Sequence, residues 1–133
     1  MTDILALARR FVSAIESGDF DAMRDCYAPQ AQIWHNTDGI GTPRQDRDTN
    51  VKSLKWMRRY LTDMRYDIAR RERTDSGFLQ THVLRAKTTL GEDFALPAAV
   101  ICTVVDGQIT KLDEYFSTAD LAPLMRAVDA AKD

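Results

Sequence analysis

The stretch FALPAAVICTVVDGQITKLDEYFS, residues 94–117, decides the fold because it contains two strands joined by a tight turn. Residues 94–105 are apolar on both strand faces, whereas residues 108–117 alternate apolar and polar side chains. Asp106 and Gly107 separate the two halves, and both residue types tolerate the positive φ that a two-residue hairpin requires. The sequence therefore predicts an antiparallel strand pair here.

Two further strands precede this pair, because apolar side chains recur at every second position from Met64 onward. We expect them over MRYDIARRER (64–73) and FLQTHVLRAKTT (78–89). Four strands in succession indicate a sheet that is mostly antiparallel.

The segment before Met64 has instead the 3.6-residue apolar period of helices. Thr2 or Asp3 can cap the first helix, and Gly18 can end it in a left-handed conformation. The predicted elements, in chain order, are a helix over 4–17, a short helix that Pro29 closes, a strand over 31–36, a loop over 37–46 and a third helix within 44–61. A last helix is expected within 119–133.

Helices first and a long antiparallel meander afterwards predict an α+β fold, in which a strongly curved sheet wraps the N-terminal helices and leaves a cone. The strand over 94–105 needs cover on both faces, and the helices can cover only one of them. A second copy of the chain is the expected cover for the other face. We therefore expect a homodimer that packs through the sheet.

The composition fits one domain that spans residues 1–133, because a hydrophobic fraction of 44% is enough for a single core. The net charge of −2 gives no field that would attract nucleic acid or an anionic membrane, so neither is expected as a partner. Charged residues interrupt the apolar side chains near the N-terminus, which argues against a signal peptide or a membrane span. Cys26 and Cys102 are expected as buried free thiols, which indicates a reducing compartment and hence the cytoplasm.

Metal and cofactor sites have no support in the sequence. The two histidines, His35 and His82, are far apart and show no metal-ligand spacing. The glycines form neither a phosphate loop nor a dinucleotide fingerprint, and no serine lies in a GxSxG motif. Cofactor-free acid–base chemistry remains as the expected chemistry.

The order of elements and two segments resemble the NTF2-like superfamily, particularly its SnoaL-like and ketosteroid-isomerase-like members. The segments are YAPQAQIWHN (27–36) and VVDGQITKLDEYFSTADL (104–121). The resemblance covers nearly the whole chain and implies the NTF2-like cone. It also implies a range of functions, because the same cone hosts isomerases, dehydratases, cyclases, epoxide hydrolases and plain binding domains.

A narrower resemblance concerns limonene-epoxide-hydrolase-like proteins, whose frames match HVLRA (82–86) and GQITKLDEYF (107–116). In this resemblance the family's Arg falls on Gln80, its first Asp on His82 and its second Asp on Glu114. The Tyr and Asn that hold the hydrolytic water fall on Trp34 and Asn36. Because the Arg that protonates the epoxide oxygen is replaced, the resemblance implies a similar pocket with a different chemistry.

Strand alternation alone predicts the same pocket. His82 shares a strand face with Phe78 and Leu84, and Glu114 lies between two large apolar side chains on the last strand. A carboxylate in such a place needs a partner, and His82 is the expected one, so that His82 acts as a general base supported by Glu114. The expected substrate-binding residues, around a small hydrophobic ligand, are Trp34, Asn36, Gln80, Leu84, Leu96 and Phe116.

The favoured function is a cofactor-free enzyme that isomerises, dehydrates or cyclises a small hydrophobic cyclic compound. The alternative is a non-catalytic ligand-binding or dimerisation domain whose cone is filled by its own side chains, in which His82 and Glu114 form a structural pair. Epoxide hydrolysis ranks below both. His35 lies on the opposite strand face from Trp34 and Asn36 and is expected at the surface or an interface.

Overall fold

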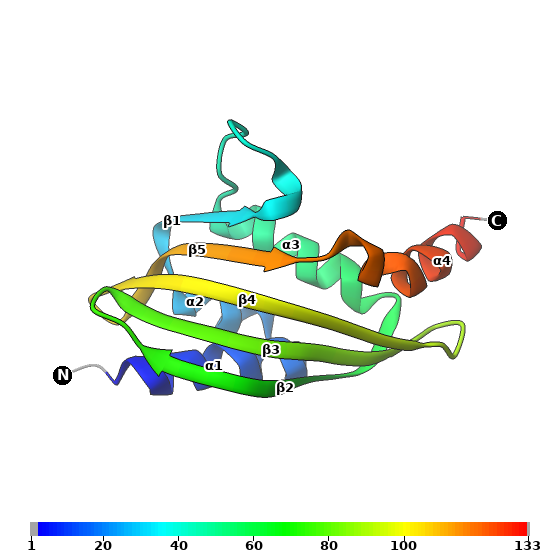
Figure 1. Cartoon of the computed structure of the whole chain (residues 1–133), viewed down its shortest axis with the longest axis horizontal. Coiled ribbons are helices and arrows are strands. Elements are labelled where there is room, and N and C mark those ends of the chain that lie inside the picture. The colour runs from blue at the N-terminus through cyan, green and yellow to red at the C-terminus, as the bar shows by residue number, and fades with distance from the viewer. Residues whose placement is uncertain (1–2, 133) are drawn as a thin grey trace.

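The computed structural model describes residues 3–132, and its elements follow the predicted order of helices first and sheet second (Figure 1). The helices are α1 (Ile4–Ser17), α2 (Phe20–Cys26), α3 (Arg47–Arg58) and α4 (Ala122–Ala130). The strands are β1 (Tyr27–His35), β2 (Leu61–Arg73), β3 (Gly77–Thr88), β4 (Asp93–Val105) and β5 (Gln108–Phe116). Short 3-10 turns, η1 (Asn36–Asp38) and η2 (Thr118–Leu121), follow β1 and β5.

The ends of α1 form as the sequence predicts. The Asp3 carboxylate accepts hydrogen bonds from the backbone N–H groups of Leu5 and Ala6, at 3.0 and 3.1 Å. Gly18 ends the helix with a φ of 75°, in the left-handed region. Thr2, the other candidate cap, lies outside the described residues.

Helices α2 and α3 are shorter than predicted, because the sheet takes the residues at their C-terminal ends. Pro29 disfavours the helical conformation at Ala28, and Tyr27 already belongs to β1. In the same way Leu61, which was expected to end the third helix, is paired with Thr88 at the start of β2.

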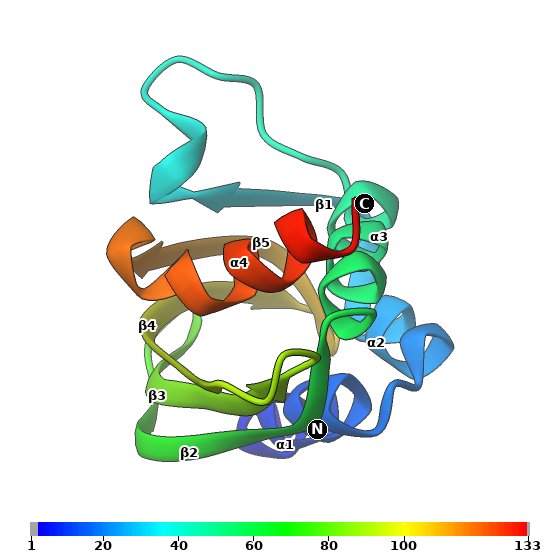
Figure 2. The ribbon, with the colours of Figure 1, turned by 90° about the vertical axis from the view of Figure 1, so that its right-hand side faces the viewer.

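The sheet has the strand order β1-β5-β4-β3-β2, and only the β1–β5 pair is parallel. The turn between β4 and β5 has φ values of 51° at Asp106 and 79° at Gly107, as the predicted hairpin requires. Viewed along the strands, the sheet curls around α1, α2 and α3, and α4 crosses one end of the curl (Figure 2). The predicted α+β class with a curved, mostly antiparallel sheet is confirmed.

The concave face of the sheet is the face that carries the core. Alternate residues of β3 and β4 point toward the helices and are buried, whereas the residues between them are partly or fully exposed. The buried side chains on this face pack against α1, and together they include Phe78, Leu84, Phe94, Leu96, Val100, Leu7, Phe11 and Ile15.

The convex face of the sheet has no covering layer among residues 3–132. Ile101 and Tyr115, on β4 and β5, point away from the helices and are 53% and 46% exposed. The helices therefore cover one face of the sheet only, as the sequence predicts. No helix in the described part of the chain is long and apolar enough to span a bilayer.

Gly77 allows the close approach of β3 to β4. A Cβ atom at this position would lie 2.0 Å from the backbone oxygen of Cys102, well inside van der Waals contact. We expect Gly77→Ala to lower the free energy of unfolding by about 2 to 3 kcal/mol, because the strands must separate to admit the methyl group. Urea unfolding measures the change.

Gly91→Ala is the matched control, because a Cβ there meets no atom within 4 Å and is opposed only by a φ of +81°. It should cost about 1 kcal/mol. Equal losses for the two variants would show that the close approach at Gly77 is not a constraint.

Candidate functional site

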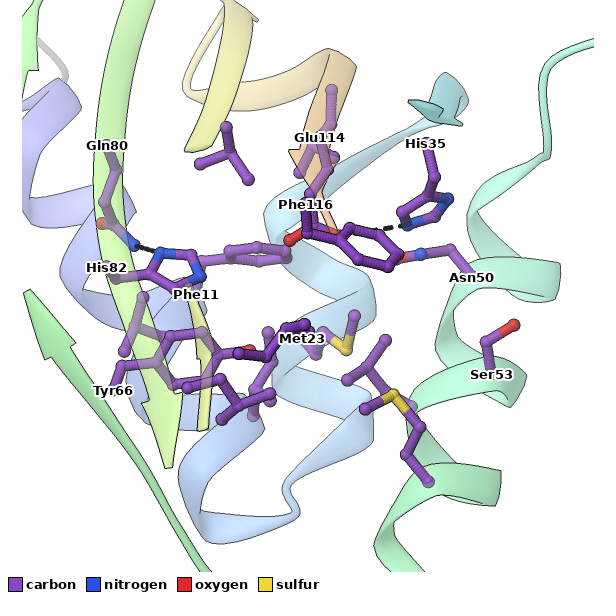
Figure 3. Close-up of a pocket in the computed structure, with 18 of the residues that line it drawn as sticks. Phe11, Met23, His35, Asn50, Ser53, Tyr66, Gln80, His82, Glu114 and Phe116 are labelled. Carbon is purple, nitrogen blue, oxygen red and sulfur yellow. Dashed lines mark hydrogen bonds and ion pairs between the residues drawn. The ribbon is translucent and has the colours of Figure 1, made fainter. Parts of the chain in front are cut away.

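The concave face of the sheet and the helices enclose a cavity of about 340 Å³. This volume falls within the range of small-molecule sites. Most of the lining is apolar and comes from both layers, including Phe11, Ile15, Met23, Leu84, Leu96 and Phe116 (Figure 3). The cone is therefore not filled by its own side chains.

A chain of three side chains leads from β2 into the cavity. Arg71 Nε donates a hydrogen bond to Gln80 Oε1 at 2.8 Å. Gln80 Nε2 contacts His82 Nδ1, also at 2.8 Å (Figure 3). A guanidinium group has only donors, so the oxygen of the Gln80 amide must face Arg71 and the NH₂ group must face His82. His82 Nδ1 therefore accepts, and the proton of the neutral ring is on Nε2.

The surroundings of His82 also oppose its protonation. The residue is 5% exposed, and its ring packs edge to face on Tyr66 with centroids 4.8 Å apart. Burial, and then the positive charge of Arg71, lower the pKa of His82 to about 4. His82 Nε2 has no hydrogen-bond partner among the described residues, so a neutral N–H donor is available to a ligand in the cavity.

Glu114 carries the second polar group of the cavity. Its Oε1 lies 3.3 Å from His35 Nε2, and His35 Nδ1 lies 3.4 Å from Asp38 Oδ2. Burial raises the pKa of Glu114, and His35 acts in the opposite direction. The carboxyl group therefore lies next to an imidazole that can exchange a proton with it, and Asp38 orients that imidazole.

Asn50 adds a buried polar group that the sequence did not reveal. Its Oδ1 accepts a hydrogen bond of 2.8 Å from the hydroxyl group of Tyr27, and Asn50 also lines the cavity. Tyr66 also lines it, and burial followed by the charge of Glu114 raises the pKa of its phenol, so the hydroxyl group stays protonated.

Most of the predicted site residues line the cavity, but their expected pairing does not occur. The ones that line it are His82, Glu114, Gln80, Leu84, Leu96 and Phe116. His82 bonds to Gln80, and Glu114 pairs with His35, so the predicted pair of His82 and Glu114 was wrong. The expected role of His82 as a base is also corrected, because Nδ1 is occupied by a donor and Nε2 carries a proton.

Trp34 and Asn36 do not line the cavity, contrary to the prediction. In the parallel β1–β5 pair Trp34 lies beside Asp113 and His35 beside Glu114, so Trp34 is on the convex face. There its ring packs edge to face on Tyr115, with centroids 5.5 Å apart. Because side chains alternate along a strand, the register that turns Trp34 outward turns His35 into the cavity.

The amide of Asn36 is used by the backbone of β5. Asn36 Nδ2 donates to the Phe116 carbonyl oxygen at 2.9 Å, and the Phe116 N–H donates to Asn36 Oδ1 at 3.1 Å. Asn36 thus holds the end of the strand that carries Glu114. Within the described range, no three His, Cys, Asp or Glu side chains are grouped so that they could hold a metal ion.

Comparisons with known proteins agree with this architecture. The model of the SnoaL-like domain family matches residues 8–112, whereas no curated protein matches the sequence significantly. One similar solved structure is IdmH from Streptomyces antibioticus, described as a candidate polyketide cyclase: 18% identity and a TM-score of 0.79, over 93% of this chain and 99% of that chain.

Two further structures are similar to a comparable degree. PrhC from Penicillium brasilianum has 17% identity and a TM-score of 0.82, over 97% of this chain and 89% of that chain. A candidate polyketide cyclase from Xanthomonas campestris has 21% identity and a TM-score of 0.74, over 91% of this chain and 96% of that chain. Identities this low establish a shared fold and no more.

The neutral state of His82 predicts a specific dependence of stability on pH. In the unfolded chain His82 takes up a proton near pH 6.5, whereas in the folded chain it does so only near pH 4. Folding stability should therefore fall as the pH drops from 6.5 to 4, and this group should account for about 3 kcal/mol of the loss. His82→Gln should lose that much less stability over the same interval in urea unfolding.

Comparing wild type with His82→Gln isolates the contribution of the His82 imidazole, because Glu114 titrates in both proteins. His35→Gln is the matched control for removing a histidine. If wild type and His82→Gln lose equal stability between pH 6.5 and pH 4, the imidazole is not held neutral by the fold.

Proposed function

The chain belongs to the SnoaL-like domain family, and we propose that it is a cofactor-independent acid–base enzyme that isomerises, dehydrates or cyclises a small, mostly apolar cyclic compound bearing a carbonyl group. One observation carries this proposal: a carboxyl group with a raised pKa and a neutral imidazole N–H donor line the same apolar cavity. Proton abstraction next to a carbonyl needs both a base and a hydrogen-bond donor.

Glu114 is the proposed acid–base group. Its carboxylate removes a proton from the carbon next to the ligand carbonyl, and its raised pKa brings its basicity closer to what the step needs. Meanwhile His82 Nε2–H donates a hydrogen bond to the carbonyl oxygen, where negative charge develops. The proton then returns to another atom of the ligand, either directly from Glu114 or by way of His35, and Asp38 stabilises the imidazolium that forms in the second case.

The position of Glu114 and His82 on one wall of the cavity supports this proposal. Glu114 lies opposite Val100, which lies opposite Gln80, so Glu114 and the Gln80–His82 segment are two strands apart. Two strand spacings amount to roughly 10 Å between backbones. A ring compound that fills the cavity can thus contact both polar groups from one side, while the helices supply apolar contacts on the other.

The charges in the cavity favour an uncharged ligand. The described lining contains no Lys or Arg, and its ionisable groups are two histidines, Asp38, Glu114 and two tyrosines. A ligand carboxylate would lose its hydration without gaining a cation and would lie near two acidic side chains. Two of the similar structures are described as candidate polyketide cyclases, which supports a polyketide-like compound with carbonyl groups as the ligand class.

Two alternatives have less support. A binding domain without catalysis would use the same cavity, but it gives no reason for a buried carboxyl group beside an imidazole. Epoxide hydrolysis would need a cationic donor in the cavity, and Arg71 contacts Gln80 from outside the lining.

Cys26 and Cys102 are buried free thiols, which supports the proposed cytoplasmic location.

Deuterium exchange into acetylnaphthalene tests the catalytic proposal. The ketone has an apolar ring system and exchangeable protons next to its carbonyl, and NMR in deuterium oxide follows their loss. Wild type should accelerate the exchange above the buffer rate, and Glu114→Gln should lower the protein-catalysed rate by at least about 100-fold. Thermal shift should show weaker binding of naphthoate than of the ketone, because the anion lacks a cationic partner.

Asp113→Asn is the matched control, because Asp113 is the neighbouring carboxylate on the convex face, where it pairs with Arg44. This variant should keep the wild-type exchange rate. If the ketone binds to wild type and its protons exchange no faster than in buffer, the protein is a binding domain and the acid–base proposal fails.

We also propose that two copies of the chain pack through their sheets. The convex face of the sheet exposes three large apolar side chains, those of Ile101, Val105 and Tyr115. Association would remove this apolar surface from water. Wild type should therefore sediment as a dimer, and Ile101→Lys as a monomer.

Ile40→Lys provides the control for the dimer, because Ile40 is fully exposed in the loop before α3 and not on the sheet. It should leave the dimer intact. A wild-type monomer at all concentrations, or a dimer that survives Ile101→Lys, would rule out this interface.

A further inference from the structure

We infer that Arg71, which lies outside the cavity, is a positioning residue that fixes His82 as a hydrogen-bond donor by orienting the amide of Gln80. The inference concerns the position of one proton, and its catalytic meaning rests on the proposed function. Three side chains from two neighbouring strands carry it, joined by contacts of 2.8 Å each.

The contact between Gln80 and His82 does not decide the tautomer by itself. A glutamine amide has a donor end and an acceptor end, and a neutral imidazole has one nitrogen of each kind. Turned one way, the Gln80 NH₂ group donates to Nδ1 and the ring proton is on Nε2. Turned the other way, the Gln80 oxygen accepts from Nδ1–H and leaves Nε2 as a free base.

Arg71 removes this ambiguity because it can only donate. The Gln80 oxygen is held by Arg71 Nε, so the amide cannot present that oxygen to His82 without breaking a charge-assisted hydrogen bond. The same arrangement opposes the imidazolium form, whose Nδ1–H would face the Gln80 NH₂ group. The donor state of His82 is therefore set from the neighbouring strand.

A bulge in β2 brings Arg71 to this position. Ile68 lies opposite His82, and regular alternation would then place Arg70 opposite Gln80. The register shifts between Ile68 and Arg70, so that Arg70 lies opposite Thr81 and Arg71 lies opposite Gln80. One extra residue in the strand thus exchanges which arginine reaches Gln80, and re-aiming a side chain is a common consequence of a β-bulge.

Arg70, which precedes Arg71 in the strand, makes a different contact. Its side chain is exposed and pairs with Glu72 on the same strand, at 2.8 Å. The two arginines are adjacent in sequence, yet one holds a buried amide and the other lies in solvent. Arg70 therefore provides a matched control for Arg71.

Long-range proton–nitrogen correlation NMR on nitrogen-15-labelled protein tests the inference, because it identifies the protonated nitrogen of His82 without a ligand. At neutral pH wild type should carry the proton on Nε2. Arg71→Met keeps an apolar stem and removes the donor, so the Nδ1-protonated form should appear. Arg70→Met should leave the spectrum of His82 unchanged.

Gln80→Glu provides an independent second variant. One carboxylate oxygen keeps Arg71, and the other accepts from Nδ1, so the proton should move to Nδ1. A wild-type ring protonated on Nδ1 would overturn the inference, as would an unchanged ring in Arg71→Met. The Arg71→Met result decides the matter even if Gln80→Glu does not fold.

A binding measurement separates this inference from the proposed function. Arg71→Met should weaken the binding of acetylnaphthalene, which accepts a hydrogen bond, by about 5-fold or more, and leave that of ethylnaphthalene unchanged. If Arg71→Met changes the tautomer while wild type binds the two compounds equally, Arg71 is confirmed as a positioning residue and His82 is not a ligand contact. Equal losses for both compounds, together with an unchanged His82 tautomer, would indicate a structural role and contradict the inference.

Discussion

The rest of the structure depends on the pleat of β3, whose pairing with β4 runs without a shift from Gly77 to Lys87. Because this register is unbroken, every second side chain faces the helices. Burial of Phe78 and Leu84 contributes about 2 kcal/mol each and fixes which face is concave. The same alternation buries Gln80 and His82 between them, so the polar groups are placed by the interaction that stabilises the sheet.

The two polar groups of the cavity, His82 and Glu114, are accommodated in different ways. Burial keeps the ring of His82 neutral, and the positive charge of Arg71 and the Gln80 NH₂ group at Nδ1 also oppose its protonation. Glu114 has an imidazole within 3.3 Å, and Asp38 lies on the far side of that ring. In the proposed mechanism one group thus donates a hydrogen bond, and the other exchanges a proton. Environments that assign opposite tasks to neighbouring groups are the pattern expected of an acid–base site.

The sequence was informative wherever a pattern was local and repeated. Alternation placed His82 and Glu114 on the concave face, and the Asp106–Gly107 dipeptide specified the hairpin. The prediction of which side chains face the cavity failed for β1, because the register of a parallel strand is set by its distant neighbour β5. An error of one residue placed Trp34 in the cavity instead of His35. The bulge in β2 could not be predicted either, because no glycine or proline marks it in the sequence. Regular alternation would have placed Arg70, and not Arg71, beside Gln80.

The link from Arg71 to His82 has a consequence for how such a cavity diversifies. A substitution of a residue that touches the ligand changes the shape of a binding site as well as its polarity. Here an arginine on a neighbouring strand determines whether an interior nitrogen donates or accepts, so one substitution outside the lining can reverse the polarity of the interior without changing its volume. The hydrogen-bonding pattern of the cavity can thereby change while its shape still fits the same ligand.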